Sequence, residues 1–222
     1  FKLGEKVGVR LSAGGYNARE FGTEGVPGEE EIRSIAPSKR TVAGSLLAQV
    51  TPDSQLGVEL TKTHERRAEY VNSFQFFPGD YDLWSAKVSY TANTDFGLVE
   101  ATAYQNVADI DASTPTFNVG FDNTVRVVKV QDLFKIGTDH SFRISGEWRN
   151  NQLENINGSG AKVSYDVYSI GGMWDWAISD QWNLVNALRL DHLRLKRSGP
   201  FQGDGMVPFT NADYDRALTE PS

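Results

Sequence analysis

Residues 46–60, LLAQVTPDSQLGVEL, alternate apolar and polar side chains, break at Pro52-Asp53-Ser54 and then alternate again in matching phase. Successive side chains of a β-strand point to opposite faces, so each run has one apolar face and one mixed face. Folding about Asp53 places three apolar pairs on one face: Val50 with Leu56, Ala48 with Val58 and Leu46 with Leu60. The stretch therefore predicts a β-hairpin that is apolar on one side.

The same pattern recurs along the chain at a regular spacing. Tight turns are expected near Leu3, Asp53, Thr94, Thr138 and Ser179. Long polar connections are expected between them, at residues 22–40, 66–80, 107–122, 151–163 and 194–213. Each hairpin therefore has a short turn at one end and a long loop at the other.

The phase of the alternation is clear in most runs and ambiguous in one. Around the Thr94 turn it places Lys87 opposite Glu100, an opposite-charge pair that contributes about 0.2 to 1 kcal/mol. The run from Val125 to Phe134 has no clear phase, which suggests a β-bulge. Nine strands are expected in all, and residues 214–222 are expected to lead into another.

Composition narrows the class of protein. The 222 residues include 21 glycines, 8 prolines and no cysteine, which suits strands and turns and excludes disulfides and thiolate metal sites. A net charge of -7, with the 22 basic residues scattered, argues against a nucleic-acid partner. No apolar stretch approaches the roughly 18 residues of a membrane helix, but alternation hides a membrane barrel from averaged hydropathy.

Strand length distinguishes the possible β architectures. A repeat of about 42 residues would suit a β-propeller, but a blade needs four short strands, and each repeat here holds two strands of about 10 to 14 residues. A tilted strand crosses hydrocarbon with some 9 to 11 residues, and its backbone groups can be satisfied in lipid only if the sheet closes. The pattern predicts an antiparallel transmembrane β-barrel with its apolar face toward lipid and its polar face toward the lumen.

The tryptophans test this prediction independently. Trp174, Trp176 and Trp182 lie close to a tight turn, whereas Trp84 and Trp148 lie about ten residues from theirs. Two aromatic girdles on either side of an apolar band about 25 Å tall would give this distribution. The alternative is that these side chains pack the core of a soluble β-sandwich.

The run from Ser169 to Leu195, SIGGMWDWAISDQWNLVNALRLDHLRL, resembles a barrel hairpin of the TonB-dependent outer-membrane receptors. In that family a strand with an acidic residue near its end turns and returns as Gly or Ala, Leu, Arg, polar, Asp; the return here is Ala187-Leu188-Arg189-Leu190-Asp191. KLGEKVGVRLSAGGYNAREF and FKIGTDHSFRISGEWRN are similar to other hairpins of the family.

The resemblance implies the fold, the partners and the location. Residues 1–222 would be one partial outer-membrane β-barrel domain, an incomplete fragment of about nine or ten strands of a 22-strand barrel, with short periplasmic turns and long extracellular loops. The abrupt start at Phe1 also suggests part of a longer protein. The implied partners are membrane lipid, the missing plug domain and remaining strands, TonB through the missing N-terminal part, and a small ligand such as a ferric siderophore. The implied location is the bacterial outer membrane.

Two sets of residues are candidates for function. Lumen-facing charges, which would hold the plug, guide a ligand or only solvate the lumen, are Arg10, Glu59, Lys87, Glu100, Arg143, Glu147, Arg149, Asp175 and Arg189. Asp175 and Arg189 lie near the turn end and are the better candidates for plug contact. The connection VNSFQFFPGDY offers a possible ligand-binding group, Phe74, Phe76, Phe77 and Tyr81, although these aromatics could also pack on each other.

The sequence provides little basis for catalysis or for a cofactor. His64, His140 and His192 are far apart, and the acidic runs Gly28-Glu29-Glu30-Glu31 and Asp109-Ile110-Asp111 lack a full cation ligand set, so no metal site is expected. We therefore expect no enzyme, and the resemblance to the TonB-dependent receptors implies a TonB-energised importer of a scarce nutrient. The alternatives are a passive outer-membrane porin and a soluble β-sheet binding module.

Overall fold

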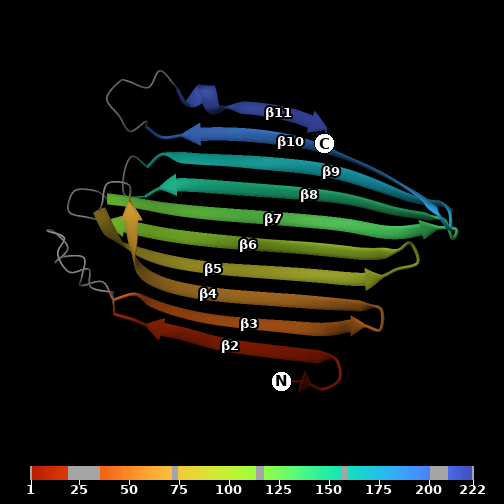
Figure 1. Cartoon of the computed structure of the whole chain (residues 1–222), viewed down its shortest axis with the longest axis horizontal. Coiled ribbons are helices and arrows are strands. Elements are labelled where there is room, and N and C mark those ends of the chain that lie inside the picture. The colour runs from red at the N-terminus through yellow and green to blue at the C-terminus, as the bar shows by residue number, and fades with distance from the viewer. Residues whose placement is uncertain are drawn as a thin grey trace.

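The computed structural model describes residues 2–19, 36–71, 75–113, 118–156, 160–200 and 210–221. Within these ranges the chain forms one eleven-stranded sheet whose strands follow each other in chain order (Figure 1). The strands are β1 (Lys2–Leu3), β2 (Val7–Asn17), β3 (Ser38–Thr51), β4 (Ser54–Val71), β5 (Gln75–Asn93), β6 (Leu98–Ser113), β7 (Asn118–Ile136), β8 (His140–Asn155), β9 (Lys162–Ser179), β10 (Trp182–Ser198) and β11 (Arg216–Pro221). All neighbouring strands pair antiparallel.

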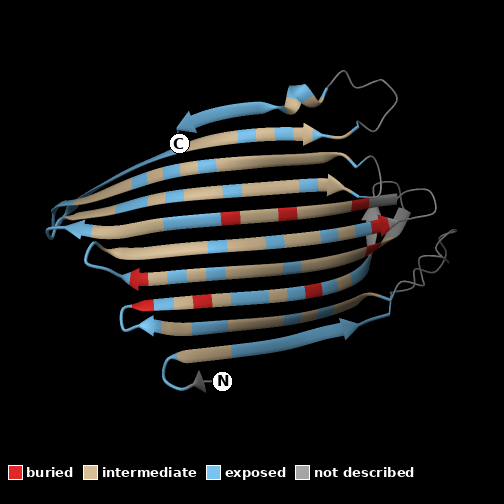
Figure 2. Cartoon of the chain, turned by 180° about the vertical axis from the view of Figure 1, so that it is seen from behind, coloured by how far each residue is buried: buried red, intermediate tan, exposed pale blue. Residues whose placement is uncertain are grey.

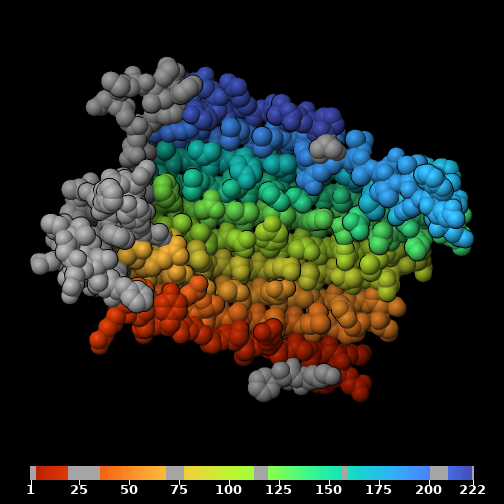
Figure 3. Space-filling view, viewed as in Figure 1, coloured from red at the N-terminus to blue at the C-terminus, as the bar shows by residue number. Residues whose placement is uncertain are grey.

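This arrangement confirms the predicted all-β, antiparallel fold. The long strands β2 to β10 are the nine expected from the alternation, and β11 is the strand expected after Tyr214. The space-filling view shows the same strands as successive bands from red to blue (Figure 3). Among the described residues, no helix is long and apolar enough to cross a membrane.

A short 3-10 helix, η2 (Asn211–Tyr214), leads into β11. The backbone N–H and the hydroxyl of Thr210 both donate hydrogen bonds to Oδ2 of Asp213. These hydrogen bonds favour the ionised carboxylate and hold the pKa of Asp213 below its usual value. The same side chain therefore fixes the start of the helix that positions the last strand.

The described sheet has almost no buried core. Its buried apolar side chains are Ala92, Ala112 and Val127 alone, and the buried positions are scattered over the sheet rather than gathered (Figure 2). The chain exposes 15595 Å², whereas a compact soluble protein of its 24.6 kDa exposes about 10,000 Å². A soluble sandwich core does not fit this structure, because the tryptophans and aliphatic side chains lie on an open sheet face.

Strand pairing shows which residues share a face, because directly paired residues point to the same side. One continuous row of paired residues is Val9, Leu46, Val58, Val88, Ala103, Val128, Trp148 and Tyr168. The adjacent row on the opposite side is Arg10, Ser45, Glu59, Lys87, Tyr104, Val127 and Arg149. We call these two sides of the sheet the apolar face and the polar face.

The apolar face carries a band of constant width. Its apolar side chains run from Trp84 to Ala92 on β5, from Val128 to Ile136 on β7 and from Tyr168 to Trp176 on β9. Each stretch has the length with which a tilted strand crosses hydrocarbon, about 9 to 11 residues. Val88 lies in the middle of the band on β5. It is in the same paired row as Val128 and Tyr168, which lie at the edge of the band on β7 and on β9. Such a stagger is expected of strands tilted as in a barrel wall.

A hydrogen-bonded polar network marks the long-loop edge of this band. Arg126 donates from Nε to Gln105 Oε1 at 3.0 Å and from Nη1 to Asn150 Oδ1 at 3.3 Å. Asp166 Oδ1 accepts hydrogen bonds from Asn150 Nδ2 at 3.0 Å and from Trp148 Nε1 at 3.2 Å. The four polar residues lie in one paired row directly beyond the row of Trp148. The apolar band therefore ends where its outermost tryptophan meets hydrogen-bonding partners.

An aromatic cluster marks the short-turn edge of the band. The rings of Phe134 and Phe142 stack with centroids 5.4 Å apart, those of Phe142 and Trp174 at 6.2 Å, and those of Trp174 and Trp176 at 5.6 Å. His140 lies beside both tryptophans and accepts a hydrogen bond at its Nδ1 from Trp174 Nε1 at 3.2 Å. Aromatic side chains thus lie at both edges of the band, as the tryptophan spacing predicts.

Two predicted registers are wrong, although every residue involved that is paired lies on the predicted face. The first hairpin pairs Ala48 with Leu56 and Leu46 with Val58, two residues away from the expected register. The register shifts between Gln49 and Thr51, and Thr51 pairs with Ser54 beside a two-residue loop. A shift of two residues preserves the faces because the side-chain period of a strand is two.

The second register error concerns Lys87. It pairs with Tyr104 on β6 rather than with Glu100, because the connection from β5 to β6 is four residues long, Thr94 to Gly97. Glu100 instead accepts a hydrogen bond from Gln131 on β7. The expected bulge in β7 is also wrong, since its pairing with β6 and β8 is unbroken. Its phase is ambiguous because Arg126 and Asp132 lie on the apolar face and Val125 and Val127 on the polar face.

The strands also extend further toward the long-loop end than the alternation predicts. β4 continues to Val71 and β5 begins at Gln75, so most of the expected connection 66–80 is strand. β6, β7 and β8 likewise extend into the connections expected at 107–122 and 151–163. Hydrogen bonding between strands continues beyond the apolar band because it does not depend on lipid.

Candidate functional site

The nine predicted lumen charges all lie on the polar face of the sheet. Pairing places Arg10, Glu59 and Lys87 in one row, and the remaining six lie on the same face of β6, β8, β9 and β10. Five of them belong to two charged groups, described below. The polar face is therefore the candidate functional surface of the described chain.

The first charged group joins β8 to β10. Arg149 Nη2 donates to Glu147 Oε1 at 3.3 Å, and Arg189 Nη2 lies 3.7 Å from the same oxygen. Arg189 also donates from Nε to both oxygens of Asp191, at 2.9 and 3.1 Å, and from Nη2 to Ser169 Oγ at 2.8 Å. Two cations and two anions thus form one network across three strands.

The second charged group joins β4 to β5. Lys87 Nζ lies 3.1 Å from Glu59 Oε1, and the two residues are directly paired across the strands. Their side chains are 44% and 56% exposed, whereas the Glu147 side chain is 13% exposed. The Glu59–Lys87 pair is therefore solvated, whereas the Glu147 carboxylate is largely shielded from water between two half-exposed arginines.

Exposure predicts different stabilities for variants of the two groups. We expect Glu147→Ala to lower the free energy of unfolding by about 1 to 3 kcal/mol, because Arg149 and Arg189 both lose a shielded acceptor. Glu59→Ala is the matched control and should change it by less than about 1 kcal/mol. Urea titrations of both variants in lipid vesicles make the comparison, and equal losses would contradict the assignment.

A cavity of about 200 Å³ lies beside the first charged group. Its lining includes Arg143, Arg189 and Gly171. A Cβ at position 171 would lie 3.2 Å from Ser145 Oγ, so a larger residue would begin to fill the cavity. The hollow and its two guanidinium groups suit an acidic side chain of an opposing segment.

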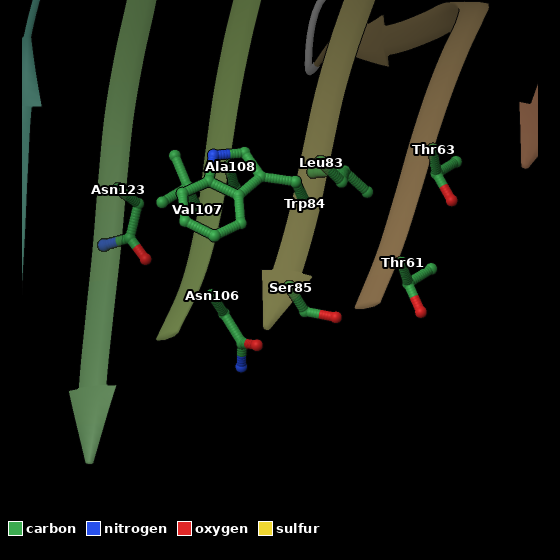
Figure 4. Close-up of a pocket in the computed structure, with 9 residues that line it drawn as sticks. All are labelled: Thr61, Thr63, Leu83, Trp84, Ser85, Asn106, Val107, Ala108 and Asn123. Carbon is green, nitrogen blue, oxygen red and sulfur yellow. The ribbon is translucent and has the colours of Figure 1, made fainter. Parts of the chain in front are cut away.

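A larger cavity, of about 340 Å³, lies across β4 to β7 and has no charged residue in its lining (Figure 4). Its polar-face residues include Thr61, Ser85 and Asn106, which are directly paired, and Thr63 and Asn123 in the next row. Asn123 donates to Asn151 Oδ1 at 2.9 Å, which extends the uncharged zone to β8. The alternation analysis missed this zone, because only strand pairing shows that these residues are neighbours.

The long-loop end of the polar face carries a third cluster. Glu65 lies 3.1 Å from both Lys39 and Arg67, and the Arg67 guanidinium lies over the Tyr81 ring, 4.7 Å from its centroid. Tyr81 is the predicted ligand-binding residue for which a side-chain contact is described. A planar cation held on an aromatic ring is a suitable surface for a charged or aromatic ligand.

The predicted aromatic loop is wrong in its secondary structure. Phe76, Phe77 and Tyr81 belong to β5, where they pair with Tyr70, Glu69 and Glu65 of β4. Phe74 lies outside the described residues. The prediction failed because the polar residues around these aromatics suggested a loop, whereas two paired strands continue there.

The three histidines have separate surroundings. His64 lies 3.5 Å from Asp82, His140 belongs to the aromatic cluster, and His192 hydrogen-bonds to Thr219 at 2.7 Å. In the part of the chain that the structure describes, no three His, Cys, Asp or Glu side chains are arranged to hold a metal ion.

The chain was compared with known proteins. No protein-family model and no curated protein matches it. Among solved structures, it is similar to the alcaligin outer-membrane receptor FauA of Bordetella pertussis (14% identity, TM-score 0.66, 89% of this chain and 32% of that one). It is also similar to the copper transporter OprC (14% identity, TM-score 0.71, 97% of this chain and 37% of that one). A third similar structure is the ferric-catecholate import receptor Fiu of E. coli K12 in its open form (12% identity, TM-score 0.73, 100% of this chain and 47% of that one).

These similarities establish the fold. The chain spans about a third to a half of the length of the solved structures that it matches, while they account for nearly all of this chain. The proteins named are receptors and a transporter. This chain therefore has the fold of part of the β-barrel of outer-membrane receptors, the fold implied by its resemblance to the TonB-dependent receptors.

Proposed function

We propose that residues 1–222 form part of the barrel of an outer-membrane importer for a scarce small-molecule nutrient. The observation that carries the proposal is the division of the sheet into an apolar band of membrane width and an opposite face with ordered charges. On this proposal the apolar face contacts lipid in the bacterial outer membrane, the polar face lines the lumen, the short turns are periplasmic and the long connections are extracellular.

Different parts of the polar face suit different steps of import. The Arg67–Tyr81 pair lies toward the long-loop end, where a ligand would first meet the wall. The uncharged cavity, the network of Glu147, Arg149 and Arg189, and the cavity at Gly171 lie near the middle of their strands, where the last two would contact a plug domain supplied by the longer protein. Energy would come from TonB acting on that plug, and the ligand would be a ferric siderophore or a similar chelate.

Uptake measurements test the proposal. Cells lacking the full-length protein should grow more slowly than wild type when a ferric siderophore, cobalamin or a sugar is the sole source of iron, cobalamin or carbon. Uptake of the affected ligand should stop when the proton gradient is collapsed. Unchanged uptake of every ligand, with no dependence on the gradient, would exclude energised import.

A passive porin is the alternative, favoured by the water-accessible ion pair of Glu59 and Lys87 on the same face. It predicts open-channel conductance when the full-length protein is placed in a planar bilayer. An energised importer, whose lumen is filled by a plug, should conduct little under the same conditions.

A further inference from the structure

A belt of uncharged residues crosses the polar face. One paired row runs from Ser12 on β2 to Tyr165 on β9, and the adjacent row runs from Gly14 on β2 to Val163 on β9. No position of either row, from β2 to β9, holds an acidic or a basic residue. We call these two rows the neutral belt. The uncharged cavity of about 340 Å³ lies within it (Figure 4).

The opposite side of the same strand segments is densely charged. There, the rows that alternate with the neutral belt lie at and beyond the long-loop edge of the apolar band. Their charged residues include Lys62, Asp82, Asp109, Asp122, Arg126 and Glu154. Local composition therefore does not account for the neutral belt, because charge is excluded from only one side of the sheet.

Three neighbouring side chains of the belt carry hydrogen-bonding groups that the described protein does not use. Thr61, Ser85 and Asn106 are directly paired across β4, β5 and β6, and all three line the cavity. None of their side chains hydrogen-bonds to another described residue. In contrast, Asn123 in the adjacent row already donates to Asn151 at 2.9 Å. Two hydroxyls and one amide, which both donate and accept hydrogen bonds, are thus available to a ligand.

The charges that border the belt near the cavity are paired with each other. On the short-turn side, Glu59 lies 3.1 Å from Lys87. On the long-loop side, Glu65 lies 3.1 Å from both Lys39 and Arg67. A charged ligand in the cavity would lose hydration without gaining an opposite charge from the lining. An uncharged ligand does not carry this cost.

We propose that the neutral belt binds an uncharged ligand rich in hydroxyl or amide groups, with Thr61, Ser85 and Asn106 as its hydrogen-bonding contacts. The inference rests on the proposed function and narrows the ligand class, because it excludes anionic ferric chelates. Leu83 and Ala108, which also line the cavity, contact the carbon–hydrogen surface of such a ligand. An oligosaccharide and an uncharged ferric hydroxamate both have this chemistry.

Ligand binding to the purified full-length protein in detergent tests the proposal without requiring transport. Calorimetric titrations compare maltohexaose, an uncharged oligosaccharide, with ferrichrome, an uncharged ferric hydroxamate, and with ferric enterobactin, an anionic ferric catecholate. We expect one uncharged probe to bind at least about tenfold more tightly than ferric enterobactin, because an unpaired charge in the cavity opposes binding. The uncharged probe that binds identifies the source of the ligand chemistry.

Variants test whether the three side chains of the belt make the contacts. Asn106→Asp keeps the size of the side chain, removes its N–H donors and should weaken binding of the uncharged probe about tenfold. Thr61→Val removes one hydroxyl and should weaken the same binding about fivefold. Asn93→Asp, at the short-turn end of β5 and outside the belt, is the matched control and should bind as the parent protein does.

Several outcomes would overturn the proposal: tighter binding of ferric enterobactin, equal binding of the three probes, no binding of either uncharged probe, or undiminished binding in Asn106→Asp. Failure of the proposed function is a separate result. Tight binding of an uncharged probe, together with uptake that does not depend on the proton gradient, would support the neutral belt as a binding site and exclude only energised import.

Discussion

Val88→Arg should lower the free energy of unfolding of the full-length protein in lipid vesicles by about 2 to 4 kcal/mol. Val88 lies in the middle of the apolar band on β5, is 44% exposed on the open face of the sheet, and pairs with Val58 and Ala103. A guanidinium at this depth must either enter hydrocarbon or draw water and headgroups into it. Urea titration followed by tryptophan fluorescence measures the loss.

Ser89→Arg provides the matched control for this substitution. Ser89 is the next residue on the same strand, at almost the same depth, but it lies on the polar face between Gly57 and Thr102. An arginine there remains hydrated in the proposed lumen and should cost less than about 1 kcal/mol. Equal destabilisation by both variants would show that the two faces do not meet different solvents.

A single alanine inserted between Gly146 and Glu147 should prevent correct assembly of the barrel. One extra residue exchanges the faces of one half of β8 relative to its neighbours. Either Arg143 moves onto the apolar face beside Ile144, or Glu147 and Arg149 move onto it at the long-loop edge of the band, beside Trp148. An arginine costs about 2 to 4 kcal/mol at the middle of the band and less toward its edges, before the loss of paired hydrogen bonds is counted.

Gel migration of unheated samples measures this effect, because a folded membrane barrel migrates differently from its heated, unfolded form. The control is a glycine inserted after Thr138, in the turn between β7 and β8, where an extra residue leaves both strands in register. The control should assemble as the parent protein does. Normal assembly of the β8 insertion would mean that a bulge can absorb the change and that register does not determine the faces.

Local alternation was sufficient to predict the faces of the sheet but not its exact pairing. The face of a residue depends only on its parity within a strand, so Leu46, Glu59 and Lys87 were assigned correctly one strand at a time. Pairing depends on the number of residues in each turn. The two-residue loop at Pro52 and the four-residue connection at Thr94 shifted the expected partners, since their turn geometry is not determined by the pattern of the flanking strands.

The clusters on the polar face could not be predicted for the same reason. Glu147 and Arg189 are 42 positions apart in the chain, and they meet because Glu147 pairs with Ser169 of β9 and Ser169 pairs with Asp191, two residues from Arg189 on β10. Thr61, Ser85 and Asn106 form one row by the same rule. The position of Asp132 on the apolar face was not predicted, because an acidic side chain on that face disturbs the alternation from which the face is inferred.

The strict neighbour-to-neighbour order of the strands has a consequence for folding kinetics. Every hydrogen-bonded strand pair in the described sheet joins segments that follow each other in the chain, so its contacts are short in sequence separation. Assembly of these hairpins therefore carries little of the entropic cost of bringing distant segments together. Most of that cost falls on the step in which the first and last strands of a closed barrel pair with each other at a seam. Mutations at that seam should slow folding far more than mutations of equal severity in β4 to β9.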